Sequence, residues 1–182
     1  YVDLDTDNYV ELSSYTHHPF YSKFILEVPD NWSYDRVYNL PVDELMEVMY
    51  NSIDEGYTIA WAADVSDRGF SWNNGVAIVP AKDLEDMTDT ERARWEELTE
   101  QEKRQRLYNF DDPGKEKEIT QEMRQNAFNN YNTTDDHGMH ITGLAKDQNG
   151  TKYFYVKNSW SDENHIYDGY LYVSDAYVRY KT

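Results

Sequence analysis

The clearest helical pattern in the chain lies in residues 41–53. Apolar residues recur there every three or four positions, at Leu45, Met46, Met49 and Ile53. This spacing places them on one face of a helix. Acidic residues occupy the first turn and a glycine follows the segment, as is typical of helix ends. The sequence therefore predicts a helix over this range.

Three further segments carry weaker patterns. Tyr57–Val65 is an apolar run that ends at a polar turn, which favours a buried strand. Thr88–Tyr108 is highly charged with a few apolar residues at helical spacing, and we interpret it as a helix with a solvated face. Thr120–Asn130 has apolar residues at similar spacing, so the sequence predicts a third helix there.

The last third of the chain changes to strand-like runs. Gly138–Ala145 and Thr151–Asn158 flank the dipeptide Asn149-Gly150, which is typical of β-hairpin turns. Two more short runs, Gly169–Ser174 and Ala176–Tyr180, predict further strands. Because helices come first and an antiparallel sheet follows, the order of elements favours the α+β class.

Composition narrows this picture. The 182 residues carry a net charge of −18, yet they include 17 Tyr, 6 Phe and 5 Trp, enough large rings to build a core. Residues 1–40 form a loop-rich lead-in broken by Pro19 and Pro29, and residues 41–182 carry the regular elements. The negative charge disfavours a nucleic-acid partner. No run approaches the roughly 18 apolar residues that indicate a membrane span.

The absence of cysteine excludes disulfides, thiolate metal sites and a thiol nucleophile within these residues. The motif His137-x-x-His140 suggests a metal site. In a strand, however, residues three apart point to opposite faces, so the sequence predicts neither a metal nor a cofactor.

The hairpin brings three polar or aromatic residues to one face. If Lys146 pairs with Thr151, then His137, Asn158 and Trp160 lie on the same side of the two strands. The Asn158 amide could then orient the imidazole while Trp160 covers the bond. The alternative is a histidine that merely opens the strand beside an unrelated asparagine, and spacing alone favours this alternative.

The same residues resemble a known family. Asp136-His137-Gly138-Met139, then Val156-Lys157-Asn158-Ser159-Trp160, then Asp168-Gly169-Tyr170-Leu171 resemble the C-terminal half of papain-like cysteine peptidases, whose triad is Cys-His-Asn. Within that superfamily the bleomycin hydrolase (aminopeptidase C) branch is most similar. The resemblance is strongest over residues 135–174 and weak over 72–117.

The resemblance implies roles for four residues. His137 would be the general base and Asn158 its orienting partner, while Trp160 would shield their bond and Met139 would lie beside the base. Two features depart from the family. Ser161 replaces the usual glycine after the tryptophan, and neither the nucleophilic Cys nor the oxyanion Gln has a counterpart.

On this resemblance we expect a papain-like fold, mainly the antiparallel β-barrel-like lobe with flanking helices, with the Cys-bearing N-terminal lobe outside this chain. The function implied is the C-terminal catalytic portion of a cysteine aminopeptidase, inactive alone. Its partners would be peptides with a free N-terminus, the missing lobe and other copies in a hexamer. A cytoplasmic location is favoured, and a secreted bacterial form stays open.

Two alternatives remain at this point. A papain-like module without its nucleophile could serve as a binding or scaffold protein. An acidic α+β binding domain unrelated to the family would require the matches to be accidental. A Cys preceded by a Gln upstream in the same reading frame would distinguish the enzyme from the papain-like module without a nucleophile.

Overall fold

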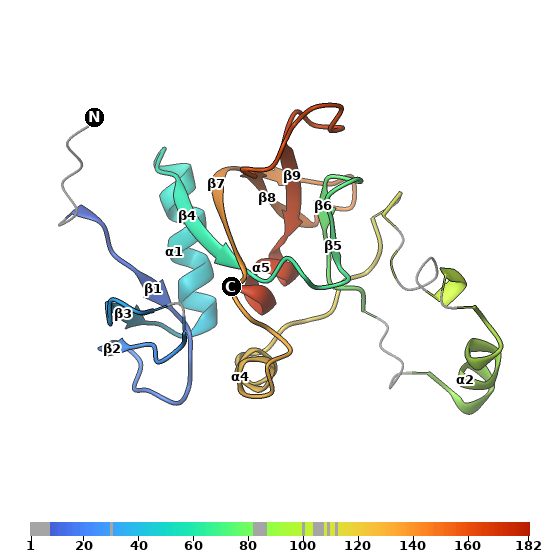
Figure 1. The fold of residues 1–182 in the computed structure, drawn as a ribbon, viewed down its shortest axis with the longest axis horizontal. Coiled ribbons are helices and arrows are strands. Elements are labelled where there is room, and N and C mark those ends of the chain that lie inside the picture. Colours follow the sequence, from blue (N-terminus) through green and yellow to red (C-terminus); the bar gives the residue numbers. More distant parts are fainter. Residues whose placement is uncertain are drawn as a thin grey trace.

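A computed structural model describes residues 8–29, 31–81, 87–99, 101–103, 108, 110–111 and 113–182. Figure 1 shows a curled sheet at the centre of the molecule, with helices beside it and the segment around α2 reaching away from it. Helices and a largely antiparallel sheet make up the fold, which confirms the predicted α+β class.

The central sheet has six strands in the order β4-β7-β8-β9-β6-β5. Neighbouring strands run antiparallel except β6 and β9, which are parallel. The sheet curls into half a barrel (Figure 1). The strands are β4 (Ile59–Ala63), β5 (Phe70–Ser71), β6 (Val76–Ala77), β7 (His137–Lys146), β8 (Lys152–Lys157) and β9 (Tyr170–Ser174).

The helices predicted at residues 41–53 and 120–130 are present as α1 (Val42–Asp54) and α4 (Gln121–Asn129). The charged segment contains α2 (Asp89–Glu96). A threonine caps the start of α2 and of α4 by accepting a backbone N–H, as helix N-termini require. None of the helices in the described ranges is long and apolar enough to cross a bilayer.

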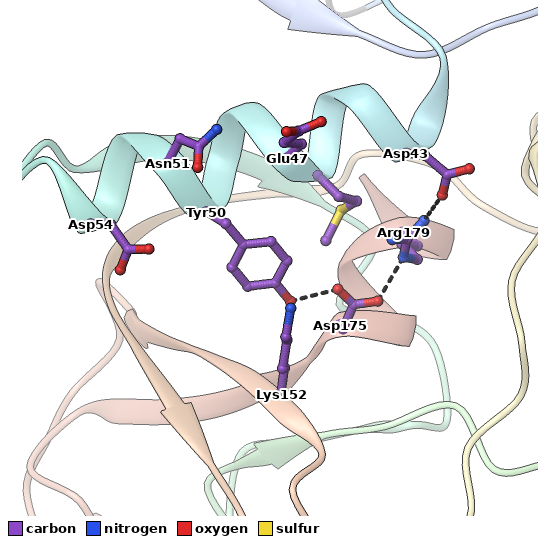
Figure 2. Close-up of a pocket in the computed structure, with 9 residues that line it drawn as sticks. Asp43, Glu47, Tyr50, Asn51, Asp54, Lys152, Asp175 and Arg179 are labelled. Atoms are coloured by element: carbon purple, nitrogen blue, oxygen red, sulfur yellow. Dashed lines mark hydrogen bonds and ion pairs between the residues drawn. The ribbon is translucent and has the colours of Figure 1, made fainter.

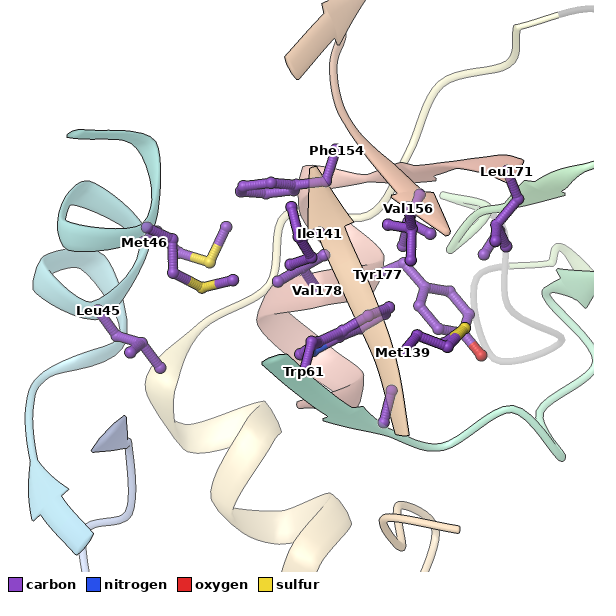
Figure 3. Close-up of a cluster of buried hydrophobic side chains, with 14 of the residues drawn as sticks. Leu45, Met46, Trp61, Met139, Ile141, Phe154, Val156, Leu171, Tyr177 and Val178 are labelled. Atoms are coloured by element: carbon purple, nitrogen blue, oxygen red, sulfur yellow. The ribbon is translucent and has the colours of Figure 1, made fainter. Parts of the chain in front are cut away.

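The hydrophobic core lies between α1, the concave sheet and the C-terminal helix α5 (Asp175–Lys181). Figure 3 shows side chains of all three converging there. The buried members include Leu45, Met46, Trp61, Met139, Ile141, Phe154, Val156, Leu171, Tyr177 and Val178. These residues hold β7 and β8 in place, and the two strands carry the candidate site at one end.

The segment Ala176–Tyr180 is part of helix α5, so its prediction as a strand is wrong. The Ser174 hydroxyl accepts the backbone N–H of Tyr177 at 3.1 Å and caps the helix. Tyr177 and Val178 are adjacent and both fully buried. Neighbouring residues of a strand point to opposite faces, whereas a helix packed on a sheet can bury both.

The lead-in contains a small sheet that the sequence analysis did not predict. Its strands are β1 (Leu12–Ser13), β2 (Lys23–Ile25) and β3 (Arg36–Asn39), in the order β1-β3-β2. Strands of two to four residues are too short to show alternation. Buried Asn39 ties the segment together, since its side chain bonds Tyr15 and His18 backbone groups.

The predicted hairpin is present, with one irregularity. At the turn Lys146 pairs with Lys152 rather than Thr151, so the prediction is off by one residue there. A bulge between Ile141 and Gly143 restores the predicted register, and His140 then pairs with Lys157. Because of this shift, the far end of the hairpin has the arrangement that the sequence predicted.

Candidate active site

His137 and Asn158 lie together at the end of the β7–β8 hairpin. His137 opens β7, and Asn158 directly follows β8. His137 Nε2 and Asn158 Oδ1 are 2.7 Å apart, within hydrogen-bond distance. The contact that the strand register predicted is therefore present. The alternative, in which Asn158 is unrelated to His137, does not fit this hydrogen bond.

The surroundings of Asn158 determine which imidazole nitrogen carries the proton. The backbone N–H of Ser159 also donates to Asn158 Oδ1, at 2.7 Å. A backbone N–H can only donate, so the oxygen faces both partners and His137 Nε2 must donate as well. The neutral ring then has its lone pair on Nδ1. Within the described residues Nδ1 has no hydrogen-bond partner, so it is free to accept a proton.

Trp160, which the sequence placed on the same side as His137, packs against the His137 ring. Its ring centroid lies 4.9 Å from that of His137, with 41° between the planes. Asn158 is only 1% exposed, and Trp160 itself remains 39% exposed. A hydrogen bond shielded from water is stronger than an exposed one, so the ring helps to hold the imidazole.

Met139 lies two residues after His137 on the same face of β7, opposite Trp61 of β4. It is buried in the hydrophobic core. Met139 thus anchors the strand that carries His137.

The second histidine of the His137-x-x-His140 motif has a different environment. His140 is exposed, and its Nε2 lies 2.7 Å from Thr58 Oγ1. The two imidazoles thus have separate partners. No group of three or more metal-binding side chains converges anywhere in the described ranges.

The acidic residue before the histidine has a structural contact. The Asp136 backbone N–H donates to Ala63 O at 3.1 Å, and its carboxylate accepts the Val65 N–H at 2.8 Å. Asp136 thus ties the start of β7 to the end of β4. This contact fixes the position from which His137 projects.

Two residues that the sequence analysis did not connect with this site lie behind Trp160. Trp72 packs edge-on against Trp160, with centroids 5.3 Å apart, and His165 stacks on Trp72 at 3.8 Å. Phe70 also contacts Trp160 edge-on. Trp72 and His165 are 93 positions apart in the sequence, so no local pattern could have linked them.

A separate pocket of about 650 Å³ lies between α1 and α5. It shares no residue with the His137 site, and Figure 2 shows that Tyr50, Asp175, Arg179 and Asp43 are joined in a chain of contacts. The Tyr50 hydroxyl donates to Asp175 at 2.5 Å, and Arg179 donates to Asp175 at 2.6 Å and also to Asp43. Burial and Asp175 together raise the pKa of Tyr50. Tyr50, Asp175, Arg179 and Asp43 thus form hydrogen bonds and ion pairs with one another.

Comparison with known proteins agrees with the fold. No family model matches the chain, and no curated protein matches it by sequence. The crystal structure of PepW from Lactobacillus rhamnosis HN001 is similar over 99% of this chain, with a TM-score of 0.63 and 17% identity. The chain has the fold of part of PepW. This fold is papain-like, as predicted, and the chain spans 35% of the PepW chain.

Proposed function

We propose that the chain is the histidine- and asparagine-bearing part of a papain-like cysteine peptidase of the aminopeptidase C type. The nucleophilic Cys would come from polypeptide outside these 182 residues. One observation carries the proposal. His137 Nε2 is committed to Asn158, while Nδ1 has a lone pair and no partner within the described residues.

This arrangement suits thiol acyl transfer. Nδ1 of His137 takes the proton from the Cys thiol, and the thiolate attacks the peptide carbonyl carbon. The imidazolium then returns its proton to the leaving amine as the C–N bond breaks. In the second half, Nδ1 accepts a proton from water, which attacks the thioester. The Cys leaves as a thiolate when the acid product is released.

Asn158 fits a histidine that changes charge during the cycle. The Nε2–H bond to the Asn158 oxygen is available to the neutral ring and to the imidazolium alike. A neutral amide therefore fixes the ring orientation throughout. The contact of the Trp160 ring with His137 supports its assignment as the shield of this bond. With the ring orientation fixed, Nδ1 keeps one direction toward the incoming thiol.

The substrate and partner assignments rest on the resemblance of the sequence motifs. They favour peptides with a free N-terminus, whose positive charge complements a chain of net charge −18. They also favour an assembly with the Cys-bearing lobe, and a hexamer of the complete protein. We expect no cofactor, because the acyl-transfer steps need only the thiol, the imidazole and water.

The test uses the complete reading frame that contains these residues. Purified protein is assayed with an aminoacyl-coumarin amide and with its N-acetylated counterpart, before and after treatment with iodoacetamide. We expect hydrolysis of the free-amine substrate that iodoacetamide abolishes, and no hydrolysis by the 182 residues alone. His137→Ala should lower kcat/KM by at least about 10³-fold. Asn158→Ala should lower it by about 10- to 100-fold through misorientation.

Two results would contradict the proposal. Undiminished activity in His137→Ala would show that His137 is not the base. A complete frame without any Cys would favour the alternative, a papain-like binding or scaffold module that lacks a nucleophile.

A further inference from the structure

His165 is the least exposed residue of the loop after Trp160. Every residue from Ser161 to Asp168 is exposed except His165, which is partly buried. Ser161, the first residue of this loop, replaces the glycine that is usual in the family. In the structure the loop packs against the β5–β6 turn, where a side chain at Gly75 would meet the Tyr167 ring at 2.4 Å.

Both ring nitrogens of His165 are fixed by backbone groups. Nδ1 accepts the N–H of Tyr167 at 3.2 Å and the N–H of Gly169 at 3.1 Å. Nε2 lies 2.8 Å from the carbonyl oxygen of Trp72 and therefore donates to it. One neutral tautomer satisfies all three contacts. The ring thus joins the loop to the β5–β6 turn.

A chain of hydrogen bonds connects His165 to His137. Nδ1 of His165 accepts the N–H of Gly169. The carbonyl of Gly169 accepts the N–H of Asn158 at 3.0 Å, and Asn158 Oδ1 accepts from His137. Gly169 has a φ of +83°, and a side chain there would meet Lys157 Nζ at 2.4 Å. The route therefore passes through a position that requires glycine.

A series of aromatic contacts connects the same two histidines. His165 stacks on Trp72 with centroids 3.8 Å apart and 28° between the planes. Trp72 meets Trp160 edge-on at 5.3 Å, and Trp160 lies 4.9 Å from His137. Aromatic contacts of this kind contribute beyond the area they bury.

We propose that His165 is a positioning residue for His137, because it holds both the amide that orients the imidazole and the indole that covers it. Its relevance to catalysis rests on the proposed function. His165 touches neither substrate nor thiol in this scheme and acts through Asn158 and Trp160. A residue at this position must have an aromatic ring that stacks on Trp72. The ring must also accept hydrogen bonds at one side and donate one at the other, and the neutral imidazole does both.

The test measures how often the His137–Asn158 bond opens. In the 182-residue chain labelled with ¹⁵N-histidine, NMR follows solvent exchange of the His137 Nε2 proton, assigned by its loss in His137→Ala. Three substitutions separate the routes. His165→Asn keeps an acceptor for the loop N–H groups but removes the stack, His165→Phe keeps the stack only, and His165→Ala removes both. Glu163→Ala, in the same loop and exposed, is the matched control.

We expect exchange to accelerate on the order of tenfold or more in His165→Ala, since a hydrogen bond and an aromatic pair each contribute modest energies. His165→Asn and His165→Phe should each show a smaller acceleration, and Glu163→Ala none. Circular dichroism checks that each variant is folded. If His165→Ala does not fold, the Asn and Phe variants decide the question.

Unchanged exchange in folded His165 variants would overturn the proposal. So would an equal acceleration in Glu163→Ala, which would show that any loop change loosens His137. The measurement needs neither thiol nor substrate. The hydrolysis assay can therefore contradict the proposed peptidase function, while the exchange measurement can independently contradict the positioning role.

Discussion

Two polar clusters in this molecule differ in how far their groups are already paired. In the pocket between α1 and α5, Asp175 binds both Tyr50 and Arg179, and Arg179 also binds Asp43. At the end of the β7–β8 hairpin, His137 makes one strong bond through Nε2. Its Nδ1 makes none within the described residues.

The difference shows why the pocket between α1 and α5 is the weaker candidate for chemistry. Groups that already bind one another stabilise the packing of α1 on α5. An imidazole with one nitrogen held and the other free can still exchange a proton. The hairpin end is therefore the better candidate for chemistry.

In the part of the chain that the structure describes, Glu116 resembles His137 in that only one of its two polar atoms has a hydrogen-bond partner. It therefore tests the comparison, with the largest effect on stability that we expect. Its Oε2 accepts from Val79 N–H at 3.0 Å and from the Ser174 hydroxyl at 2.5 Å, whereas Oε1 is buried without a partner. Burial is the main reason why its pKa is raised to about 7. Because Glu116 lies outside the His137 site, we expect its unpaired oxygen to affect the stability of the fold and not the activity.

The sign of the pH effect follows from the raised pKa. The folded state holds the Glu116 proton up to about pH 7, whereas the unfolded state loses it near the ordinary value. Stability therefore falls as pH rises between these values. We expect the wild-type chain to lose on the order of 3 kcal/mol relative to Glu116→Gln between pH 4 and 8. Urea unfolding at several pH values measures this difference, and parallel curves would contradict it.

The pocket itself provides a smaller test. Tyr50→Phe removes the hydroxyl that donates to Asp175 and should lower the free energy of unfolding by about 1 kcal/mol. Hydrolysis by the complete protein should not change, because the pocket shares no residue with the His137 site. Tyr57→Phe is the control, since Tyr57 is 70% exposed. A fall in activity specific to Tyr50→Phe would undermine the comparison.

The sequence was sufficient for those parts of the fold that have strong local signals. Helix α1 shows a clear apolar period, and Asn149-Gly150 marks the hairpin. Alternation along two paired strands then places His137 near Asn158. The predicted contact is correct because the bulge in β7 restores the register that the turn had shifted.

The parts that could not be predicted depend on tertiary packing or on very short elements. Helix α5 has seven residues, too few for an apolar period to separate it from a buried strand. The strands of the lead-in have two to four residues. The contact between Trp72 and His165 joins distant segments, and only the curled sheet brings them behind Trp160.

The central claim is that Nδ1 of His137 faces a cysteine thiol in the complete protein. The rate of alkylation by iodoacetamide at pH 6 tests it most directly, because an adjacent imidazolium keeps a thiol ionised below its ordinary pKa. We predict that one Cys of the complete protein reacts at least about tenfold faster than the same Cys in the His137→Ala variant. Equal rates in the two proteins would contradict the account.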